Sequence, residues 1–143
     1  MNAIKTEVVV LGAGPGGYAA AFYAADKGKK VILVEQEKRL GGVCLNRGCI
    51  PSKALLHVAR LVHETREAKA WGLDFGEPQI DVDKLRRWKD QVIGKMSQGL
   101  SQLCKQRGVN YVPGRAVFQN ANTVEVAGQK VTRTGTIRER IGE

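Results

Sequence analysis

Two apolar runs near the start of the chain predict buried β-strands. Residues 6–11 (T-E-V-V-V-L) and 30–35 (K-V-I-L-V-E) are almost continuous in aliphatic and β-branched side chains, which is typical of strands covered on both faces in a parallel sheet. Residues 18–27 between them are rich in alanine, with no helix breaker before Gly28, and this predicts a helix. Strand, helix and strand within about thirty residues form a βαβ unit.

The rest of the chain alternates between helical and strand-like patterns. After a loop over residues 39–43, Pro51 is suited to the first turn of a helix that we expect to continue to about Ala70. Asp81 or Asp83 can cap a second helix, in which apolar side chains recur every three or four residues. Short strands follow near residues 109–112, 116–118 and 123–126, with turns at 120–122 and 127–128. The pattern predicts an α/β, Rossmann-like domain with a parallel sheet, helices and a β-meander.

Composition places the chain among ordinary globular domains. It has 143 residues, of which 43% are hydrophobic and 26% are charged, enough for one domain with its own core. No run approaches the roughly 18 apolar residues of a membrane helix. The first residues contain no apolar signal core, so a cytoplasmic location is expected.

The formal charge of +9 leaves a polyanion-binding site open. Much of the basic excess lies in residues 84–107 and 133–140, and aromatic side chains do not alternate with the basic ones as a base-stacking platform requires. This distribution favours an ordinary solvated surface.

The glycine-rich segment after the first strand carries the clearest motif. Gly12-Ala-Gly14-Pro-Gly-Gly17 matches the pattern G-x-G-x-x-G, follows a predicted strand and opens a predicted helix. Gly12 allows a tight turn, Gly14 lets the backbone approach a pyrophosphate, and Gly17 lets helix and strand pack closely. Glu35, at the end of the next predicted strand, can accept hydrogen bonds from an adenosine ribose. The segment therefore predicts dinucleotide binding, without separating FAD from NAD.

Cys44 and Cys49 form the second motif. Five residues apart on a regular helix, they would lie about 140° apart around its axis and could not form a disulfide, but an irregular helix start near Gly48 and Pro51 would allow one. Thiols near a helix N-terminus and a cation such as Lys53 have lowered pKa values. This favours a pair that cycles between disulfide and dithiol, with a flavin on the neighbouring fingerprint as its electron partner.

Other readings of the cysteines and histidines stay open. Cys44 and Cys49 can be two ordinary cysteines, and their spacing differs from that of a C-x-x-C zinc site. His57 and His63 are six residues apart and fall on different helix faces, so we expect ordinary helix residues and no metal site. Cys104 is expected to be a small buried side chain.

Gly41-Gly-Val-Cys44-Leu-Asn-Arg-Gly-Cys49-Ile-Pro-Ser-Lys53 resembles the redox-disulfide signature of the flavin-dependent pyridine nucleotide–disulfide oxidoreductases. The residues at 45–46 and 50–52 make it most similar to the bacterial members that oxidise dihydrolipoamide, rather than to glutathione or mercuric reductases. The similarity extends over about residues 4–129, including the segments 54–59, 75–78 and 122–126.

The resemblance implies a redox cycle in which electrons pass from dihydrolipoamide to the disulfide, then to FAD and then to NAD⁺. Cys44 would exchange with dihydrolipoamide and Cys49 would contact the flavin, with Lys53 near the reactive flavin nitrogen. The partners implied are dihydrolipoamide on a 2-oxo-acid dehydrogenase complex and a second subunit of a homodimer, with no nucleic acid or membrane. The residues implied to hold FAD are Gly12, Gly14, Gly17, Glu35, Gln36, Gly41, Gly42, Val43, Cys44, Lys53 and, through its backbone against the adenine, Ala116.

The C-terminal segment departs from the family. Residues 1–129 are expected to form the FAD-binding domain, whereas residues 130–143 form a divergent tail without the family's Ala-Thr-Gly strand, second glycine fingerprint or His–Glu pair. We therefore expect a domain incomplete at its C-terminus, with a frameshift near Gln129 as one origin, that does not turn over NAD⁺ alone. The alternative is a catalytically silent FAD-binding remnant or an interaction module.

Overall fold

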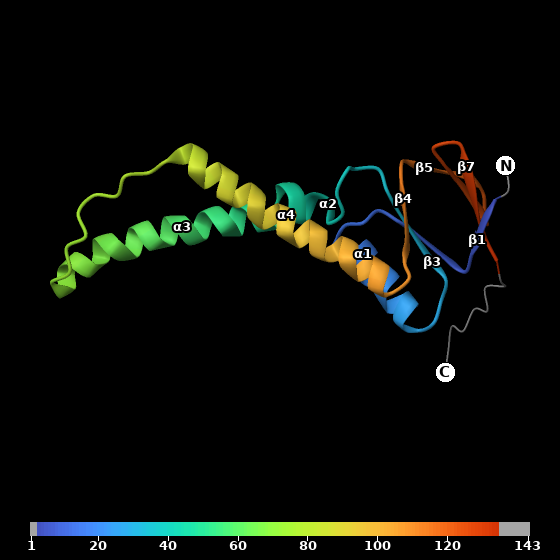
Figure 1. The fold of residues 1–143 in the computed structure, drawn as a ribbon, viewed down its shortest axis with the longest axis horizontal. Helices are drawn as coiled ribbons and strands as arrows, with labels where there is room; N and C mark the ends of the chain where they lie inside the picture. Colours follow the sequence, from blue (N-terminus) through green and yellow to red (C-terminus); the bar gives the residue numbers. More distant parts are fainter. Residues whose placement is uncertain (1–2, 135–143) are drawn as a thin grey trace.

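The computed structural model describes residues 3–134 as an α/β fold. Figure 1 shows the strands gathered at one end of the molecule and a long helical hairpin extending from them. The elements are β1 (Ile4–Thr6), β2 (Val8–Leu11), α1 (Pro15–Asp26), β3 (Val31–Glu35), α2 (Gly42–Arg47), α3 (Cys49–Glu67), η1 (Ala68–Trp71), α4 (Val82–Gln106), β4 (Asn110–Pro113), β5 (Ala116–Asn120), β6 (Thr123–Val126) and β7 (Gln129–Arg133).

A three-stranded parallel sheet in the order β2-β3-β4 carries the βαβ unit. β3 is central and all five of its residues are buried, as its apolar run predicts. β2 has only one neighbouring strand in the described sheet, so its valines are half-buried and Leu11 is exposed. The prediction of a strand covered on both faces is thus confirmed for β3 and holds in part for β2, in which Val8 and Val10 pack against one core cluster and Val9 against the other.

The first predicted strand is divided at Glu7. Its carboxylate accepts hydrogen bonds from the backbone N–H of Lys30 at 2.9 Å and from the ammonium of Lys29 at 3.0 Å. The hydroxyl of Thr6, which is buried, donates to the carbonyl of Lys30 at 2.7 Å. These contacts separate β1 from β2, and β1 joins the second sheet instead.

The second sheet has the order β1-β7-β6-β5 and contains the predicted meander. The strands β5 and β6 and the turn at 127–128 are confirmed, and β7 is an additional strand that pairs with both β6 and β1. The boundary expected after Gln129 falls inside β7, whereas residues 135–143 of the expected tail lie outside the described residues.

The core lies on both faces of β3. On one face, Leu33 packs in a cluster with residues of α1 and α4 such as Ala21 and Leu100. On the other face, Ile32 and Val34 pack against three buried valines of the meander, Val124, Val126 and Val131. The parallel sheet therefore lies between a helical layer and the meander, and the end of β3 is held from both sides.

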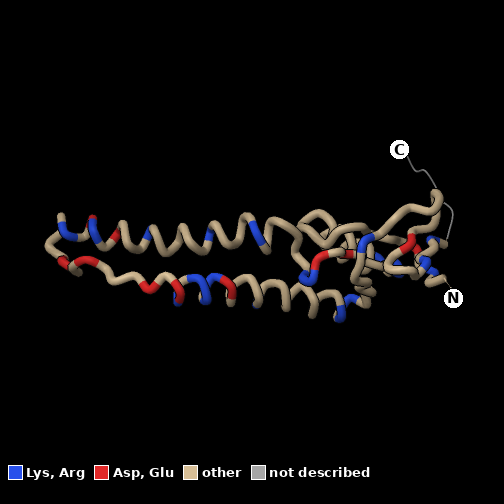
Figure 2. Tube along the Cα trace, turned by 90° about the horizontal axis from the view of Figure 1, so that it is seen from above, with Lys and Arg blue, Asp and Glu red and all other residues tan. Residues whose placement is uncertain are grey.

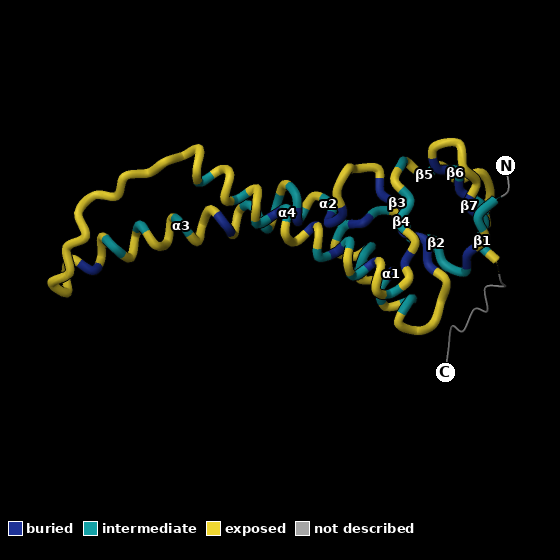
Figure 3. The backbone as a smooth tube through the Cα atoms, viewed as in Figure 1, coloured by how far each residue is buried: buried dark blue, intermediate teal, exposed yellow. Residues whose placement is uncertain are grey.

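The helices α3 and α4 form the hairpin that projects from the sheets. Asp81 caps α4 by accepting a hydrogen bond from the backbone N–H of Lys84 at 2.8 Å. Figure 3 shows that the far part of the hairpin is mostly exposed. In Figure 2, basic and acidic residues are interspersed along both helices, and ion pairs such as Arg60–Glu64 join neighbouring turns. None of the helices within residues 3–134 is long and apolar enough to cross a membrane.

Two helix starts differ from the predictions. α1 begins at Pro15 rather than at residue 18, because proline is compatible with the first helical turn. Residues 42–43, expected in a loop, belong to the short helix α2, and α3 begins at Cys49, two residues before Pro51. Both cysteines thus lie on helices separated by Gly48.

Candidate functional site

The glycine-rich turn connects β2 to α1 as the fingerprint predicts. Gly12 has φ +92° and donates its N–H to the carbonyl of Val34 at 2.7 Å. A Cβ on Gly17 would overlap the carbonyl oxygen of Gly12, so only glycine allows this close packing of helix and strand. α1 has no side-chain cap and no acidic residue in its first turn, which leaves the N–H groups of Gly16 and Gly17 available to an anion.

A second glycine segment lies directly against this turn. Gly41 donates its N–H to the carbonyl of Ala13 at 2.8 Å. Gly42, at φ +61°, approaches so closely that a Cβ on it would lie 2.6 Å from the Cα of Gly14. The segment that leads into the cysteines is therefore fixed to the dinucleotide fingerprint by backbone contacts.

Glu35 is held at the end of β3, where only 7% of it is exposed. One carboxylate oxygen accepts the N–H of Ala13 at 2.8 Å, and the other accepts the N–H of Glu37 at 2.9 Å. Burial, together with the negative charge of Glu35 and then Cys104, raises the pKa of Tyr111 on the adjacent strand β4. Because both of its oxygens are held by backbone N–H groups, the carboxylate of Glu35 has a fixed position at the C-terminal edge of the parallel sheet.

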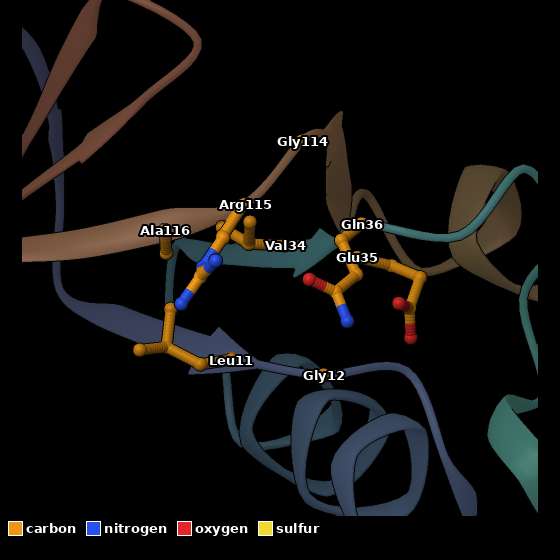
Figure 4. Close-up of a pocket in the computed structure, with 8 residues that line it drawn as sticks. All are labelled: Leu11, Gly12, Val34, Glu35, Gln36, Gly114, Arg115 and Ala116. Atoms are coloured by element: carbon orange, nitrogen blue, oxygen red, sulfur yellow. The ribbon is translucent and has the colours of Figure 1, made fainter.

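A cleft of about 270 Å³ opens at this edge (Figure 4). It brings together the ends of β2 and β3 and the connection from β4 to β5, the position where parallel sheets bind their ligands. Gly114, at φ +141°, shapes the connection and donates its N–H to the carbonyl of Glu35 at 2.8 Å. The lining residues are Leu11, Gly12, Val34, Glu35, Gln36, Gly114, Arg115 and Ala116.

The residues predicted to hold a dinucleotide fall into two neighbouring groups. Four of them line the cleft: Gly12, Glu35, Gln36 and Ala116. The others follow the contact between the two glycine segments and continue along α2 and α3: Gly14, Gly17, Gly41, Gly42, Val43, Cys44 and Lys53. Four further lining residues were not predicted from the sequence: Leu11, Val34, Gly114 and Arg115. The last two directly precede the predicted Ala116, so they could have been included with it.

Cys44 and Cys49 form a disulfide with their Cα atoms 4.8 Å apart. The bridge is possible because the helix is interrupted between them: α2 ends at Arg47, and Gly48 has φ −127° and ψ −103°, outside the helical region. A Cβ on Gly48 would come within 3.2 Å of the carbonyl oxygen of Val43. The expected irregular helix start is confirmed.

The surroundings of the disulfide combine fixed and exposed groups. Asn46 donates hydrogen bonds to the carbonyls of Leu40 at 3.3 Å and Gly42 at 2.9 Å, which holds α2 to the glycine segment. Cys44 is half-buried, whereas Cys49, Lys53 and Val43 are exposed. Of the two sulfur-bearing residues, Cys49 is therefore the more accessible in this structure.

The remaining candidate residues lie away from this site. Cys104 is 3% exposed in the core, and burial raises the pKa of its thiol, as expected for a structural cysteine. His57 and His63 are exposed on α3, and His63 lies 3.2 Å from a carboxylate oxygen of Glu67. Within residues 3–134, no three or more His, Cys, Asp or Glu side chains come together so that they could hold a metal ion.

Comparison with known proteins adds the family. The family model described as pyridine nucleotide-disulphide oxidoreductase matches residues 6–136, a span that includes both glycine segments and the disulfide. The chain belongs to this family. It is an oxidoreductase family whose members use FAD, with NAD as co-substrate.

The similar proteins in this family are called dihydrolipoyl dehydrogenases. The chain is 52% identical over 127 residues to the one from Vibrio cholerae, covering 89% of this chain and 27% of that protein. It is 51% identical over 121 residues to the Haemophilus influenzae protein, covering 85% and 25%, and 47% identical over 125 residues to that of Haloferax volcanii, covering 87% and 26%. The chain thus spans about a quarter of the length of these relatives.

The described residues fit the family's flavin dinucleotide. The uncapped N-terminus of α1 is suited to a pyrophosphate, the glycines at 12 and 14 leave backbone exposed to it, and Glu35 is a fixed acceptor for ribose hydroxyls. The cleft that is lined by Glu35 and Ala116 also includes Gly12 of the glycine turn. The family's cofactor therefore has matching partners for its phosphates and its adenosine.

Proposed function

We propose that the chain is the FAD-binding and disulfide-bearing part of a dihydrolipoyl dehydrogenase. The observation that carries the proposal is the backbone contact between Gly14 and Gly42, which joins a dinucleotide fingerprint to a segment that leads into a disulfide. A structural disulfide has no need of a dinucleotide site beside it. A redox disulfide does need an electron partner at close range.

In this proposal, the adenosine of FAD occupies the cleft, with its ribose on Glu35 and its adenine beside the backbone of Ala116. The pyrophosphate lies over Gly12, Gly14 and the first turn of α1. The segment 36–44 and the exposed Cys49 would hold the flavin end of the cofactor. Lys53 follows Cys49 by one turn of α3 and supplies a positive charge near the flavin ring.

The disulfide would be reduced by thiol–disulfide exchange. One thiolate of dihydrolipoamide attacks the Sγ of Cys44, which forms a mixed disulfide and releases Cys49 as a thiolate. The second lipoamide thiolate attacks the lipoamide sulfur of that mixed disulfide, closes the cyclic disulfide of lipoamide and releases Cys44. Dihydrolipoamide loses an electron pair and two protons to become lipoamide, and the chain's disulfide gains them to become a dithiol.

FAD, when bound, would supply the acceptor for this electron pair and the hydride chemistry that reduces NAD⁺. The roles of this chain's residues are to bind and orient the flavin and to keep the two sulfurs at its edge. The partners in the proposal are dihydrolipoamide of a 2-oxo-acid dehydrogenase complex and the second subunit of a homodimer. We place the cycle in the cytoplasm, whose reducing conditions suit a buried free thiol at Cys104.

A catalytically silent interaction module is the second candidate. It is favoured by the exposed large apolar side chains near the hairpin tip, which include Trp71, Leu73 and Phe75. Such a module could bind FAD without its disulfide taking part in electron transfer. The two candidates therefore differ in what a dithiol does to the FAD-loaded chain.

Selective alkylation tests the proposed roles of the cysteines. The FAD-loaded chain is reduced with dihydrolipoamide, treated with iodoacetamide and mapped by mass spectrometry. We expect alkylation mainly at Cys44, because the flavin covers Cys49. Equal labelling of the two cysteines would overturn the assignment of roles. A disulfide that dihydrolipoamide leaves intact would favour the interaction module.

A further inference from the structure

Arg115 occupies the cleft beside Glu35 without a partner of its own. It lies in the connection from β4 to β5 and lines the cleft. Within residues 3–134, its guanidinium takes part in neither an ion pair nor a hydrogen bond. Other arginines of the same region are paired, for example Arg107 with Asp26 and Arg47 with Glu37.

The acidic residue of the cleft, Glu35, is held by backbone groups and does not pair with Arg115. Both oxygens of Glu35 already accept backbone N–H groups, from Ala13 and Glu37. Figure 4 shows the side chain of Arg115 extending toward Leu11, away from the carboxylate of Glu35. The guanidinium therefore stays over the apolar part of the cleft.

The guanidinium of Arg115, an exposed residue, has apolar side chains of the cleft beside it. Leu11, Val34 and Ala116 supply apolar surface, and the flat face of an arginine stacks on aromatic rings more readily than a lysine ammonium does. The N–H groups suited to phosphate lie instead at the start of α1, beyond Gly12. Arg115 is thus placed for a base and not for the pyrophosphate.

We propose that Arg115 is a specificity residue that stacks its guanidinium on the adenine ring of the bound dinucleotide. The inference rests on the proposed function, because it takes FAD as the occupant of the cleft. It goes further than the proposed function, in which the adenine meets only the backbone of Ala116. Here the side chain of Arg115 also contributes to the affinity for FAD. FMN, which has no adenine, does not use this contact.

Isothermal titration of the full chain with FAD, ADP and FMN tests the proposal. Arg115→Gln is expected to weaken FAD and ADP binding about 5- to 30-fold, which corresponds to the usual strength of a desolvated cation–π contact. Arg115→Lys is expected to lose most of the same affinity, because lysine keeps the charge but not the planar face. FMN binding is expected to be unchanged in both variants.

Arg87→Gln is the matched control, because it removes the same charge from an exposed position on α4 and should leave all three affinities as they are. An Arg115→Gln variant that binds FAD and ADP with wild-type affinity would overturn the role of Arg115 and leave the proposed function standing. The inference would also be overturned if Arg115→Lys bound FAD and ADP as tightly as the wild-type chain and the loss caused by Arg115→Gln disappeared at high salt. That result would show that position 115 acts by charge attraction to phosphate. A wild-type chain that binds neither FAD nor ADP would overturn the proposed function and, with it, this inference.

Discussion

Gly42 lies against Gly14 with no room for a side chain between them. A Cβ on Gly42 would be 2.6 Å from the Cα of Gly14 and 3.2 Å from its nitrogen. Because Gly14 precedes α1 and Gly42 begins α2, this contact fixes the helix that carries Cys44 to the turn that is suited to a pyrophosphate. The position of the disulfide-bearing helix relative to the glycine turn is thus set by two glycines.

Gly42→Ala is expected to damage the site. The added methyl group meets backbone atoms that cannot move aside, and the residue has φ +61°, which disfavours any side chain. We expect a loss of at least about 2 kcal/mol in the free energy of unfolding and strongly weakened FAD binding. Urea unfolding and a fluorescence titration with FAD measure the two effects.

Gly94→Ala is the control for this experiment. Gly94 lies within α4 and has open space where a Cβ would be, so alanine should stabilise the helix by about 0.5–1 kcal/mol. Equal behaviour of the two variants would contradict the role of the glycine contact.

Glu35→Gln is expected to destabilise the chain even without a ligand. The buried carboxylate accepts one N–H at each oxygen, whereas an amide would present its own N–H groups to one of these donors. We expect a cost of about 1–3 kcal/mol, measured by urea unfolding of the ligand-free chain. Glu64→Gln, which removes one exposed i,i+4 ion pair on α3, should cost no more than about 0.5 kcal/mol. Similar costs for the two variants would contradict a holding role for Glu35.

Much of the fold and of the site could be predicted from local sequence. The apolar run in β3, the glycine pattern and the cysteine spacing each reflect short-range constraints, and each is found where expected. The division of the first strand at Glu7 could not be predicted, because it depends on contacts with Lys29 and Lys30 that lie far away in sequence.

The same limit applies to β7 and to the cleft. β7 is held between β6 and β1, and the latter comes from the other end of the described chain. Arg115 enters the site only because β4 pairs with β3 in parallel across a long helical insertion. Such non-local pairing leaves little trace in a short window of sequence.

Reduction of the disulfide is expected to have a modest effect on stability. The bridge closes a short loop, with a sequence separation of 5, and the chain-entropy relation gives about 2 kcal/mol for a loop of this size. A dithiol should therefore lower the free energy of unfolding by about that amount in the wild-type chain. The Cys44→Ser/Cys49→Ser variant should start at the lower value and not respond to the dithiol. A response in this variant would point to an effect elsewhere in the chain.

Cys104 is expected to remain unmodified while the chain is folded. It is 3% exposed, and burial raises the pKa of its thiol, so the fraction of reactive thiolate at neutral pH is lower than for a free cysteine. Iodoacetamide should label the reduced Cys44 and Cys49 in the folded chain without FAD, and Cys104 only after unfolding. Labelling of all three cysteines at similar rates at neutral pH would contradict this expectation. It would show that the core around α4 opens readily.

Counting electrons tests the central claim, that the fingerprint and the disulfide form one flavin redox site. The FAD-loaded chain is titrated with dithionite under anaerobic conditions while its visible spectrum is followed. We predict that the wild-type chain takes up about four electrons per bound FAD, two for the disulfide and two for the flavin, and that the Cys44→Ser/Cys49→Ser variant takes up about two. Equal uptake by the two chains, or no bound FAD to titrate, would contradict the claim.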